Sequence, residues 1–348
     1  MKINNTEINE NSRTYIIAEL SANHEQNYDL AEETIRAMKQ SGADAVKLQT
    51  YTPDSMTLDS DKPWFQTRND SLWAGQKMYD LYKKGETPWE WHKPLKKLAE
   101  SLEMDFFSSP FDLKSVNLLE SIDVPAYKIA SLEITDIPLI KKCAETGKPI
   151  IISTGAARIE DIDLAVKTCL DAGNNKIALL KCTSAYPTPY NEVNLKQIQS
   201  LKERYNIVVG LSDHTLGTEV PIASVVMGAK IIEKHFILSR NSNGLDKDFS
   251  LEPQEFKQMT DAIRNIEQAI GNGSFDLTSK IETATKFRRS LFVSADMKKG
   301  EIFTENNIKS VRPGLGLHPK YYYEILGKRA TKDIEKGEPL SFEDIADM

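Results

Sequence analysis

Two of the five histidines in this 348-residue chain stand at the ends of consecutive apolar runs. His214 closes the run IVVGLSDH, and His235 lies in the next one, AKIIEKHF. Imidazole is a common ligand for Mn, Fe, Co, Ni and Zn, so neighbouring strands could bring both rings to one metal ion. With oxygen ligands and water completing the shell, such a site would suit Mn²⁺ better than a closed structural Zn²⁺. A hydrogen-bonded pair of polar residues at strand ends is an equally open interpretation.

Two lysines interrupt apolar runs, where a charge is costly unless it is paired. Lys47 lies in DAVKLQT and Lys128 in AYKIAS. Lysines supply charge and serine hydroxyls supply directed donors, so together they predict a pocket for an anion such as phosphate. The serines expected nearby are Ser109, Ser131, Ser153 and Ser212. Alternatively, each lysine pairs with a carboxylate of the same strands, for which Glu19, Glu133 and Glu233 are the candidates.

The elements that position these residues form a repeating pattern of β-type apolar runs separated by amphipathic segments of helical length. The eight runs cover 15–20, 44–50, 104–110, 126–131, 149–155, 176–184, 206–213 and 229–236. Eight β/α alternations predict a TIM-type (β/α)8 barrel over residues 1–270, rather than an open doubly wound sheet. Barrel active sites lie at the C-terminal ends of the strands. The carboxylates Glu19, Glu133 and Asp246 are therefore candidates for proton transfer or hydroxyl binding, although each alone would also fit an ordinary ion pair.

Two parts of the chain depart from this repeat. The connection 51–86 is far longer than a usual βα loop, so we expect it either to cover the barrel mouth or to pack on its flank. Its aromatic residues are Trp64, Phe65, Trp73, Tyr79 and Tyr82. Residues 271–287 are rich in Gly, Ser and Thr and predict a linker. Short strand-like pieces between turn signals then predict a small β-rich domain over 288–348.

The composition, 40% hydrophobic and 27% charged, is typical of a soluble globular protein. The net charge is -7 and no basic run offsets it, which makes nucleic acid an improbable partner. The polar start and the lack of any apolar run near about eighteen residues exclude a signal peptide and a membrane span, so we expect a cytoplasmic protein. The three cysteines form no CxxC pair and are expected to be reduced.

Short segments along nearly the whole chain resemble the sialic acid synthase family, in collinear order. In the predicted barrel they are AELSANH (18–24), AVKLQTYTPD (45–54), FSSPFD (107–112), YKIAS (127–131), STG (153–155), YPTPY (186–190), GLSDHT (210–215), EKHF (233–236) and SLEP (250–253). After the linker, KKGEIFT, VRPGLG and LGKRA look like the antifreeze-like, or SAF, domain of that family.

The resemblance implies an enzyme that condenses phosphoenolpyruvate with the open-chain aldehyde of a 2-acetamido hexose, releasing phosphate. It implies that His214 and His235 hold a divalent metal, Mn²⁺ first, with Mg²⁺ or Co²⁺ as alternatives. The residues that match the phosphoenolpyruvate site are Lys47, Ser109, Lys128, Ser131, Ser153, Ser184 and Ser212. Glu133 matches the acid suspected of proton transfer, with Glu19 beside it. The residues that match sugar contacts are Glu19, Gln49, Tyr186, Asp246 and Arg312. Family dimers insert the equivalent of Arg312 into the partner's active site, which implies a domain-swapped homodimer.

Within the family, ELSANH, KLQTYTPD, LWAGQKMYDLY, TPWEWH and DFSLEP look more like pseudaminic acid synthases than N-acetylneuraminate synthases. A substrate that loses a 6-hydroxyl and gains an N-acetyl group favours a more apolar pocket, for which we expect Trp64, Trp73 and Tyr79 as lining. Ser184 departs from the Asn of neuraminate synthases, and Lys247 stands where His would be common. N-acetylneuraminate and legionaminate synthesis, a carbohydrate-binding protein acting through the SAF-like domain, and a scaffold subunit are the alternatives.

Overall fold

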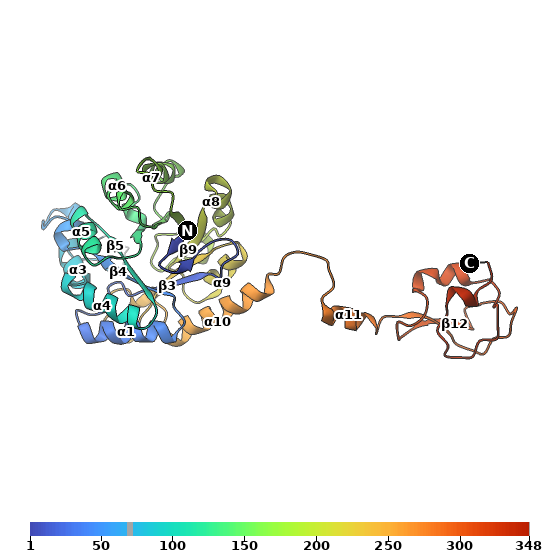
Figure 1. Ribbon diagram of the computed structural model, residues 1–348. Helices are drawn as coiled ribbons and strands as arrows, with labels where there is room; N and C mark the ends of the chain where they lie inside the picture. Colours follow the sequence, from blue (N-terminus) through green and yellow to red (C-terminus); the bar gives the residue numbers. More distant parts are fainter. Residues whose placement is uncertain (68–71, 348) are drawn as a thin grey trace. The chain divides into compact units, whose positions relative to one another are not determined.

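The computed structural model describes residues 1–67 and 72–347. Eight parallel strands close into a barrel in the order β10-β3-β4-β5-β6-β7-β8-β9, as the eight apolar runs predicted (Figure 1). Their bounds are β3 Tyr15–Glu19, β4 Ala45–Thr50, β5 Asp105–Pro110, β6 Tyr127–Ile129, β7 Ile150–Ser153, β8 Ile177–Cys182, β9 Val208–Asp213 and β10 Ile231–His235. The fold class is therefore confirmed as a TIM-type barrel.

Helices cover the outside of the barrel, so the strands are buried on both faces and read as almost continuous apolar runs. The covering helices are α1 Tyr28–Gln40, α4 Trp89–Ser101, α5 Leu113–Ser121, α6 Ile137–Glu145, α7 Ile159–Asp171, α8 Gln197–Tyr205, α9 Glu219–Val226 and α10 Pro253–Ala269. Local capping sets where several begin: Asn27 accepts the first amides of α1, and Asp112 accepts an amide of α5. A short hairpin, β1 Lys2–Ile3 and β2 Thr6–Glu7, precedes the barrel.

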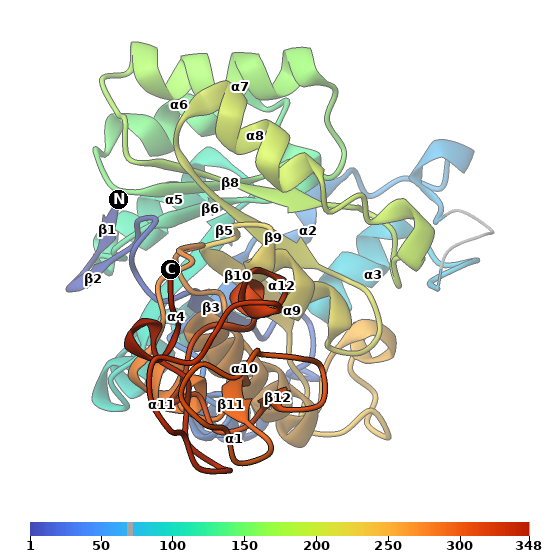
Figure 2. The same ribbon diagram turned by 90° about the vertical axis from the view of Figure 1, so that its right-hand side faces the viewer.

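The long connection after β4 carries two helices, α2 Pro53–Met56 and α3 Met78–Gly85, which lie side by side at the C-terminal end of the barrel strands (Figure 2). Its two sides are joined by the bridge between Gln66 and Lys77. The connection was expected either to cover the barrel mouth or to pack on its flank. It lies at the barrel mouth, where Met56, Trp73 and Met78 line a cavity.

The chain divides into two compact units, Met1–Gly271 and Asn272–Met348. Residues 271–287, expected to be a linker, include the short helix α11 Ser279–Thr285, whose residues are exposed apart from the half-buried Thr285. The second unit has its own core, built around the antiparallel pair β11 Ser290–Val293 and β12 Ile308–Val311 and the short helix α12 Tyr322–Ile325.

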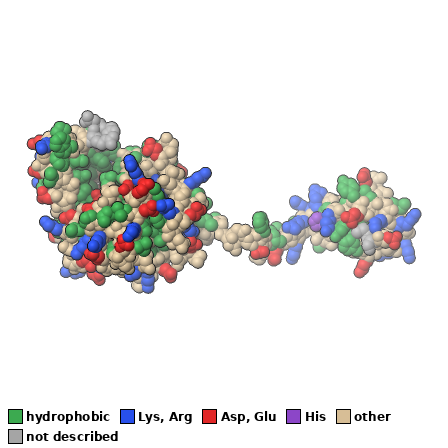
Figure 3. All heavy atoms as spheres, turned by 90° about the horizontal axis from the view of Figure 1, so that it is seen from above, with side chains coloured by type: hydrophobic (Ala, Val, Ile, Leu, Met, Phe, Trp, Pro, Cys, Tyr) green, Lys and Arg blue, Asp and Glu red, His purple; other side chains and the backbone are tan. Residues whose placement is uncertain are grey.

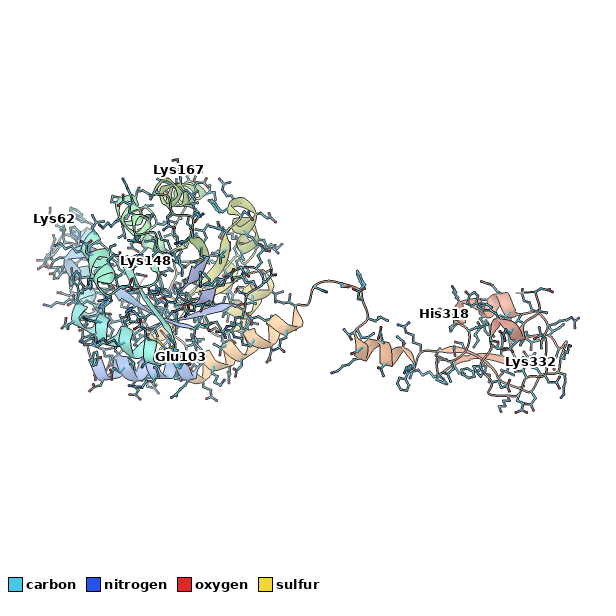
Figure 4. The ribbon with its side chains drawn as sticks, in the orientation of Figure 1. Lys62, Glu103, Lys148, Lys167, His318 and Lys332 are labelled. Atoms are coloured by element: carbon cyan, nitrogen blue, oxygen red, sulfur yellow. The ribbon has the colours of Figure 1, made fainter. Side chains whose placement is uncertain are left out.

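Lysine, arginine and acidic side chains are interspersed over the face of the barrel unit that Figure 3 shows. Lys62 and Lys167 lie at the periphery of this unit (Figure 4). In the described ranges, 1–67 and 72–347, no helix has both the length and the apolar character needed to cross a membrane.

Candidate active site

A cavity of about 420 Å³ opens at the C-terminal ends of the barrel strands. Its polar side chains come mostly from the strand ends and the short loops after them: Ser21, Gln49, Ser131, Glu133, Tyr186, His235 and Asp246. Its apolar side chains come largely from the long connection after β4 and from the loop after β10, and include Met56, Trp73, Met78, Leu81 and Leu245. A concave, mostly apolar pocket with a few convergent polar groups is the usual form of a small-molecule site.

Two buried lysines and two buried carboxylates form a compact charge cluster at the inner end of the site. Lys47 Nζ lies 2.7 Å from Glu19 Oε1 and 3.7 Å from Glu233 Oε1. Lys128 Nζ also lies 3.7 Å from Glu233 Oε1, so one carboxylate serves both cations. Burial opposes the charge of Lys47, but Glu19 and Glu233 raise its pKa above the ordinary value. Burial and the nearby Lys47 lower the pKa of Lys128, although Glu233 opposes this. Each lysine is therefore paired with a carboxylate of the barrel strands, as the second interpretation of the sequence proposed. Because both lysines lie 3.7 Å from the same oxygen of Glu233, they are also close enough to share one anion.

Two of the serines expected near the lysines contact this charge cluster. Ser109 Oγ lies 3.4 Å from Lys47 Nζ, and Ser212 donates to Glu233 Oε1 at 2.9 Å. The buried hydroxyls of Ser153 and Ser184 have no hydrogen-bond partner among the described residues. Because unsatisfied buried polar groups are rare, these two hydroxyls indicate that a polar ligand belongs here.

Gly155 keeps the space between these hydroxyls open. A Cβ at this position would lie 2.6 Å from Ser184 Oγ and 2.9 Å from both Cys182 Sγ and Ser131 Oγ. Its amide donates to Ser131 Oγ at 3.1 Å. The backbone after β7 can therefore approach the serines closely only because residue 155 has no side chain.

The two predicted metal ligands are brought together, with their ring centroids 5.2 Å apart. His235 Nε2 lies 3.2 Å from Glu19 Oε2, and its Nδ1 lies 3.6 Å from Asp246 Oδ2. His235 Nδ1 is buried and has no hydrogen-bond partner in the part of the chain that the structure describes. Burial lowers the pKa of His235 to about 3, so its imidazole is neutral, as a metal ligand must be.

No group of three or more His, Cys, Asp and Glu side chains is arranged around one metal position in residues 1–67 and 72–347. The two imidazoles, with the carboxylate oxygens of Glu19 and Asp246 beside His235, fit a divalent metal site that water or substrate completes. His214 Nδ1 lies 3.4 Å from the carbonyl oxygen of Thr183 and 3.8 Å from Cys182 Sγ.

The register of β9 and β10 fixes the positions of these histidines. Ser212 pairs with Glu233, two residues before each histidine, and Asp213 pairs with Lys234, one residue before each histidine. Lys234 Nζ lies 2.6 Å from Asp213 Oδ2, and both side chains are buried. Lys234 also donates to the carbonyl oxygen of Thr215.

The remaining predicted carboxylates lie in the same cavity. Asp246 accepts a hydrogen bond from Ser21, and burial raises the Asp246 pKa to about 6. Burial also raises the pKa of Glu133 to about 7, although Lys128 opposes this shift. A carboxyl group that titrates near neutral pH can both donate and accept a proton under physiological conditions.

Of the other predicted sugar contacts, Gln49 and Tyr186 line the same cavity, whereas Arg312 belongs to the second compact unit. Gln49 donates to Glu19 Oε1 at 2.9 Å and to Ser21 Oγ at 2.8 Å, and Tyr186 packs 4.5 Å from His214 between ring centroids. Arg312 directly follows β12, in the second compact unit.

Of the aromatic residues expected to line the pocket, only Trp73 does so. Trp64 is 67% exposed, Tyr79 is half-buried and donates to Asp54 Oδ1 at 3.3 Å, and neither lines the cavity. Lys247, in the departing GLDK turn, donates to the carbonyl oxygen of Ser242 at 3.1 Å. From the sequence, Glu233 was expected only as an ion-pair partner of a lysine. The aliphatic residues that line the cavity, such as Met78, Leu81 and Leu245, were not predicted.

The chain belongs to the NeuB family, because the model of that family matches residues 34–275. A SAF domain matches residues 288–346. The chain is 47% identical to the pseudaminic acid synthase of Campylobacter jejuni, over 99% of both chains. It is 48% identical to the pseudaminic acid synthase of Helicobacter pylori, over 95% of this chain and 97% of the other.

Two solved structures resemble the chain. The N-acetylneuraminic acid synthetase of Leptospira borgpetersenii, crystallised with citrate, superposes with a TM-score of 0.74 at 30% identity, covering 82% of this chain and 94% of the other. The spore coat polysaccharide biosynthesis protein SpsE of Bacillus subtilis superposes with a TM-score of 0.68 at 36% identity, covering 99% and 98%.

Proposed function

We propose that the chain is a pseudaminic acid synthase, which condenses phosphoenolpyruvate with the open-chain aldehyde of 2,4-diacetamido-2,4,6-trideoxy-altrose and water. One structural observation carries the reaction type: the lysine–serine cluster and the histidine pair converge at the strand ends of one barrel. The choice of sugar rests on similarity, since identity to the legionaminic acid synthase of Campylobacter jejuni is 40%, below the values for the pseudaminic acid synthases.

In this proposal the lysine–serine cluster binds the carboxylate and phosphate of phosphoenolpyruvate. Lys47 and Lys128 supply charge, and the unpartnered hydroxyls of Ser153 and Ser184 supply donors. Ser109, Ser131 and Ser212 complete the cradle. Because these groups are held in place before substrate arrives, little reorganisation is required as charge develops.

His214 and His235 would hold the divalent metal, for which Mn²⁺ is our first choice. The bound ion would act as a Lewis acid toward the aldehyde oxygen. The chain's own contribution is to keep the His235 imidazole neutral and oriented, with Glu19 and Asp246 beside it. Gln49 and Tyr186 would contact the acetamido and hydroxyl groups of the sugar.

The bond changes fit the ionisable groups of the site. Carbon 3 of phosphoenolpyruvate bonds to the aldehyde carbon, water adds to carbon 2, and the bond from carbon 2 to the bridging oxygen breaks as phosphate leaves. We assign Glu133 the proton taken from the attacking water, because its carboxyl lies in the cavity and its pKa is near 7.

The same proposal includes a cytoplasmic homodimer in which Arg312 of one subunit completes the sugar site of the other. It is supported by the position of Arg312 in the SAF unit, in the VRPGLG segment that resembles the family. Sedimentation of the full chain would test the dimer directly.

The testing experiment measures phosphate release and product mass with purified protein and Mn²⁺, with and without EDTA. The sugars compared are the diacetamido altrose, its legionaminic counterpart and N-acetylmannosamine. We expect turnover with the altrose sugar that chelation abolishes. Preference for another sugar would assign the chain to another branch of the family, and no turnover with any of them would refute the synthase assignment.

A further inference from the structure

The cavity has two chemically different sides. The strand ends contribute most of the ionisable and amide groups, whereas the long connection and the loop after β10, which also carries Asp246, contribute aliphatic side chains. We define the aliphatic wall as Met56 of α2, Met78 and Leu81 of α3, and Leu245. All four are partly buried, as residues facing a cavity should be.

The aliphatic wall is held in place by contacts outside the wall itself. Trp73 Nε1 donates to the carbonyl oxygen of Leu245 at 3.2 Å, which ties the long connection to the loop after β10. Gly85, at the end of α3, packs so closely that an added Cβ would lie 3.2 Å from Leu245 Cδ1 and 2.8 Å from the Tyr51 hydroxyl oxygen. Gln26 Nε2 donates to the carbonyl oxygen of Lys84 at 3.1 Å. The wall is therefore preformed, as small-molecule pockets usually are.

The four side chains of the aliphatic wall carry no hydroxyl, amide or charged group. The Thr67 hydroxyl, which also lines the cavity, already donates to carbonyl oxygens of its own segment and accepts the amide of Gln76 at 3.0 Å. Tyr51 and Tyr82 also line the cavity. A polar group pressed against the aliphatic side chains would thus lose water without gaining a partner.

The position of the chemistry orients the sugar. Its aldehyde carbon has to meet the histidine pair and the phosphoenolpyruvate cluster, so the other end of the open chain, carbon 6, points away from the strand ends. We propose that the aliphatic wall binds the carbon 6 methyl group and makes the enzyme selective for 6-deoxy sugars. This inference rests on the proposed function and assigns its specificity to Met56, Met78, Leu81 and Leu245.

The expected selectivity is moderate. A hydrophobic pocket rejects a substrate that adds a single hydroxyl by roughly 100-fold in kcat/KM. The decisive pair of substrates is the diacetamido altrose with and without a hydroxyl at carbon 6, because they differ in nothing else. We expect the wild-type full chain to prefer the 6-deoxy sugar by about this factor.

The variant that tests the wall is the double substitution Met78→Gln and Leu81→Asn, which keeps side-chain size while adding amide groups. We expect the preference for the 6-deoxy sugar to fall at least about tenfold, because the added amides can replace the lost water. Leu58→Asn is the matched control, since Leu58 lies in the same connection, is 65% exposed and does not line the cavity. Its preference should equal that of the wild type.

An unchanged preference in the double variant would overturn the aliphatic-wall proposal while leaving the synthase assignment intact. Wild-type protein that turns over neither sugar would refute the synthase assignment and the wall with it. If the double variant is inactive with both sugars, the single variants Met78→Gln and Leu81→Asn are measured against the same ratio. Retention of full preference by both would equally overturn the proposal.

Discussion

Glu133→Gln should separate the catalytic role of this residue from its effect on stability. The carboxyl lies in the cavity, where burial raises its pKa from 4.5 to about 7 despite the nearby Lys128. The amide keeps the size of the side chain but can neither ionise nor take a proton. We expect kcat/KM to fall by about 10²- to 10⁴-fold, the usual contribution of a general base.

The sign of the stability effect follows from linkage. A carboxyl with a raised folded-state pKa favours folding below its unfolded pKa, and this contribution is lost as the pH rises toward 7. Such a shift corresponds to about 3 kcal/mol, and partial exposure of Glu133 reduces this to about 1 to 2 kcal/mol. Relative to wild type, Glu133→Gln should therefore be nearly neutral at pH 5 or below and stabilising by that amount at pH 8.

Two measurements on the full chain check this reasoning. Urea unfolding at acid pH and at pH 8 gives the difference in free energy of unfolding between variant and wild type. The pH profile of kcat/KM should rise through an ionisation near 7 in wild type and lack it in the variant. Stability curves that run parallel at both pH values, or a wild-type profile without that ionisation, would refute the assignment of a near-neutral carboxyl at Glu133.

Three further substitutions test other parts of the site. His235→Ala should weaken Mn²⁺ binding in calorimetry by more than about 100-fold, with an unchanged circular dichroism spectrum, and undiminished binding would remove the histidine pair as the metal site. Gly155→Ala should push Ser184 and Ser131 from their positions and raise KM for phosphoenolpyruvate at least about tenfold, the loss of one charged hydrogen bond; an unchanged KM would place the anion elsewhere. Arg312→Ala should raise KM for the sugar at least about tenfold while the sedimentation coefficient stays that of the wild type. Normal sugar kinetics would contradict the shared site.

The barrel could be predicted from sequence because each strand is buried on both faces and each helix on one. Runs such as PIIISTG and KIALLKCTS coincide with β7 and β8, and the strand-end rule then places His214, His235 and the serines on one side of the barrel. The same logic found Lys47 and Lys128, since a charge inside an apolar strand needs a partner.

Pairwise geometry could not be predicted in this way. Glu233 was visible as a strand carboxylate, but its equal distance from two lysines depends on the closure of the barrel. Met78 and Leu81 belong to a long connection that carries both cavity-lining apolar residues and exposed ones such as Leu58 and Trp64. For that reason Trp64 was expected in the pocket and is exposed, whereas Leu245, from a distant loop, lies beside Trp73.

The buried ion pair of Lys234 and Asp213 favours the correct register between β9 and β10. A slip of one residue between β9 and β10 would turn every side chain of the moved strand to its opposite face. Lys234 would then be buried without its counter-ion, at a cost of about 3 to 5 kcal/mol, and His235 would leave the cavity. Misaligned molecules are thus too unstable to accumulate. In a purified sample, the fraction of molecules in which the rings of His214 and His235 lie side by side should equal the folded fraction.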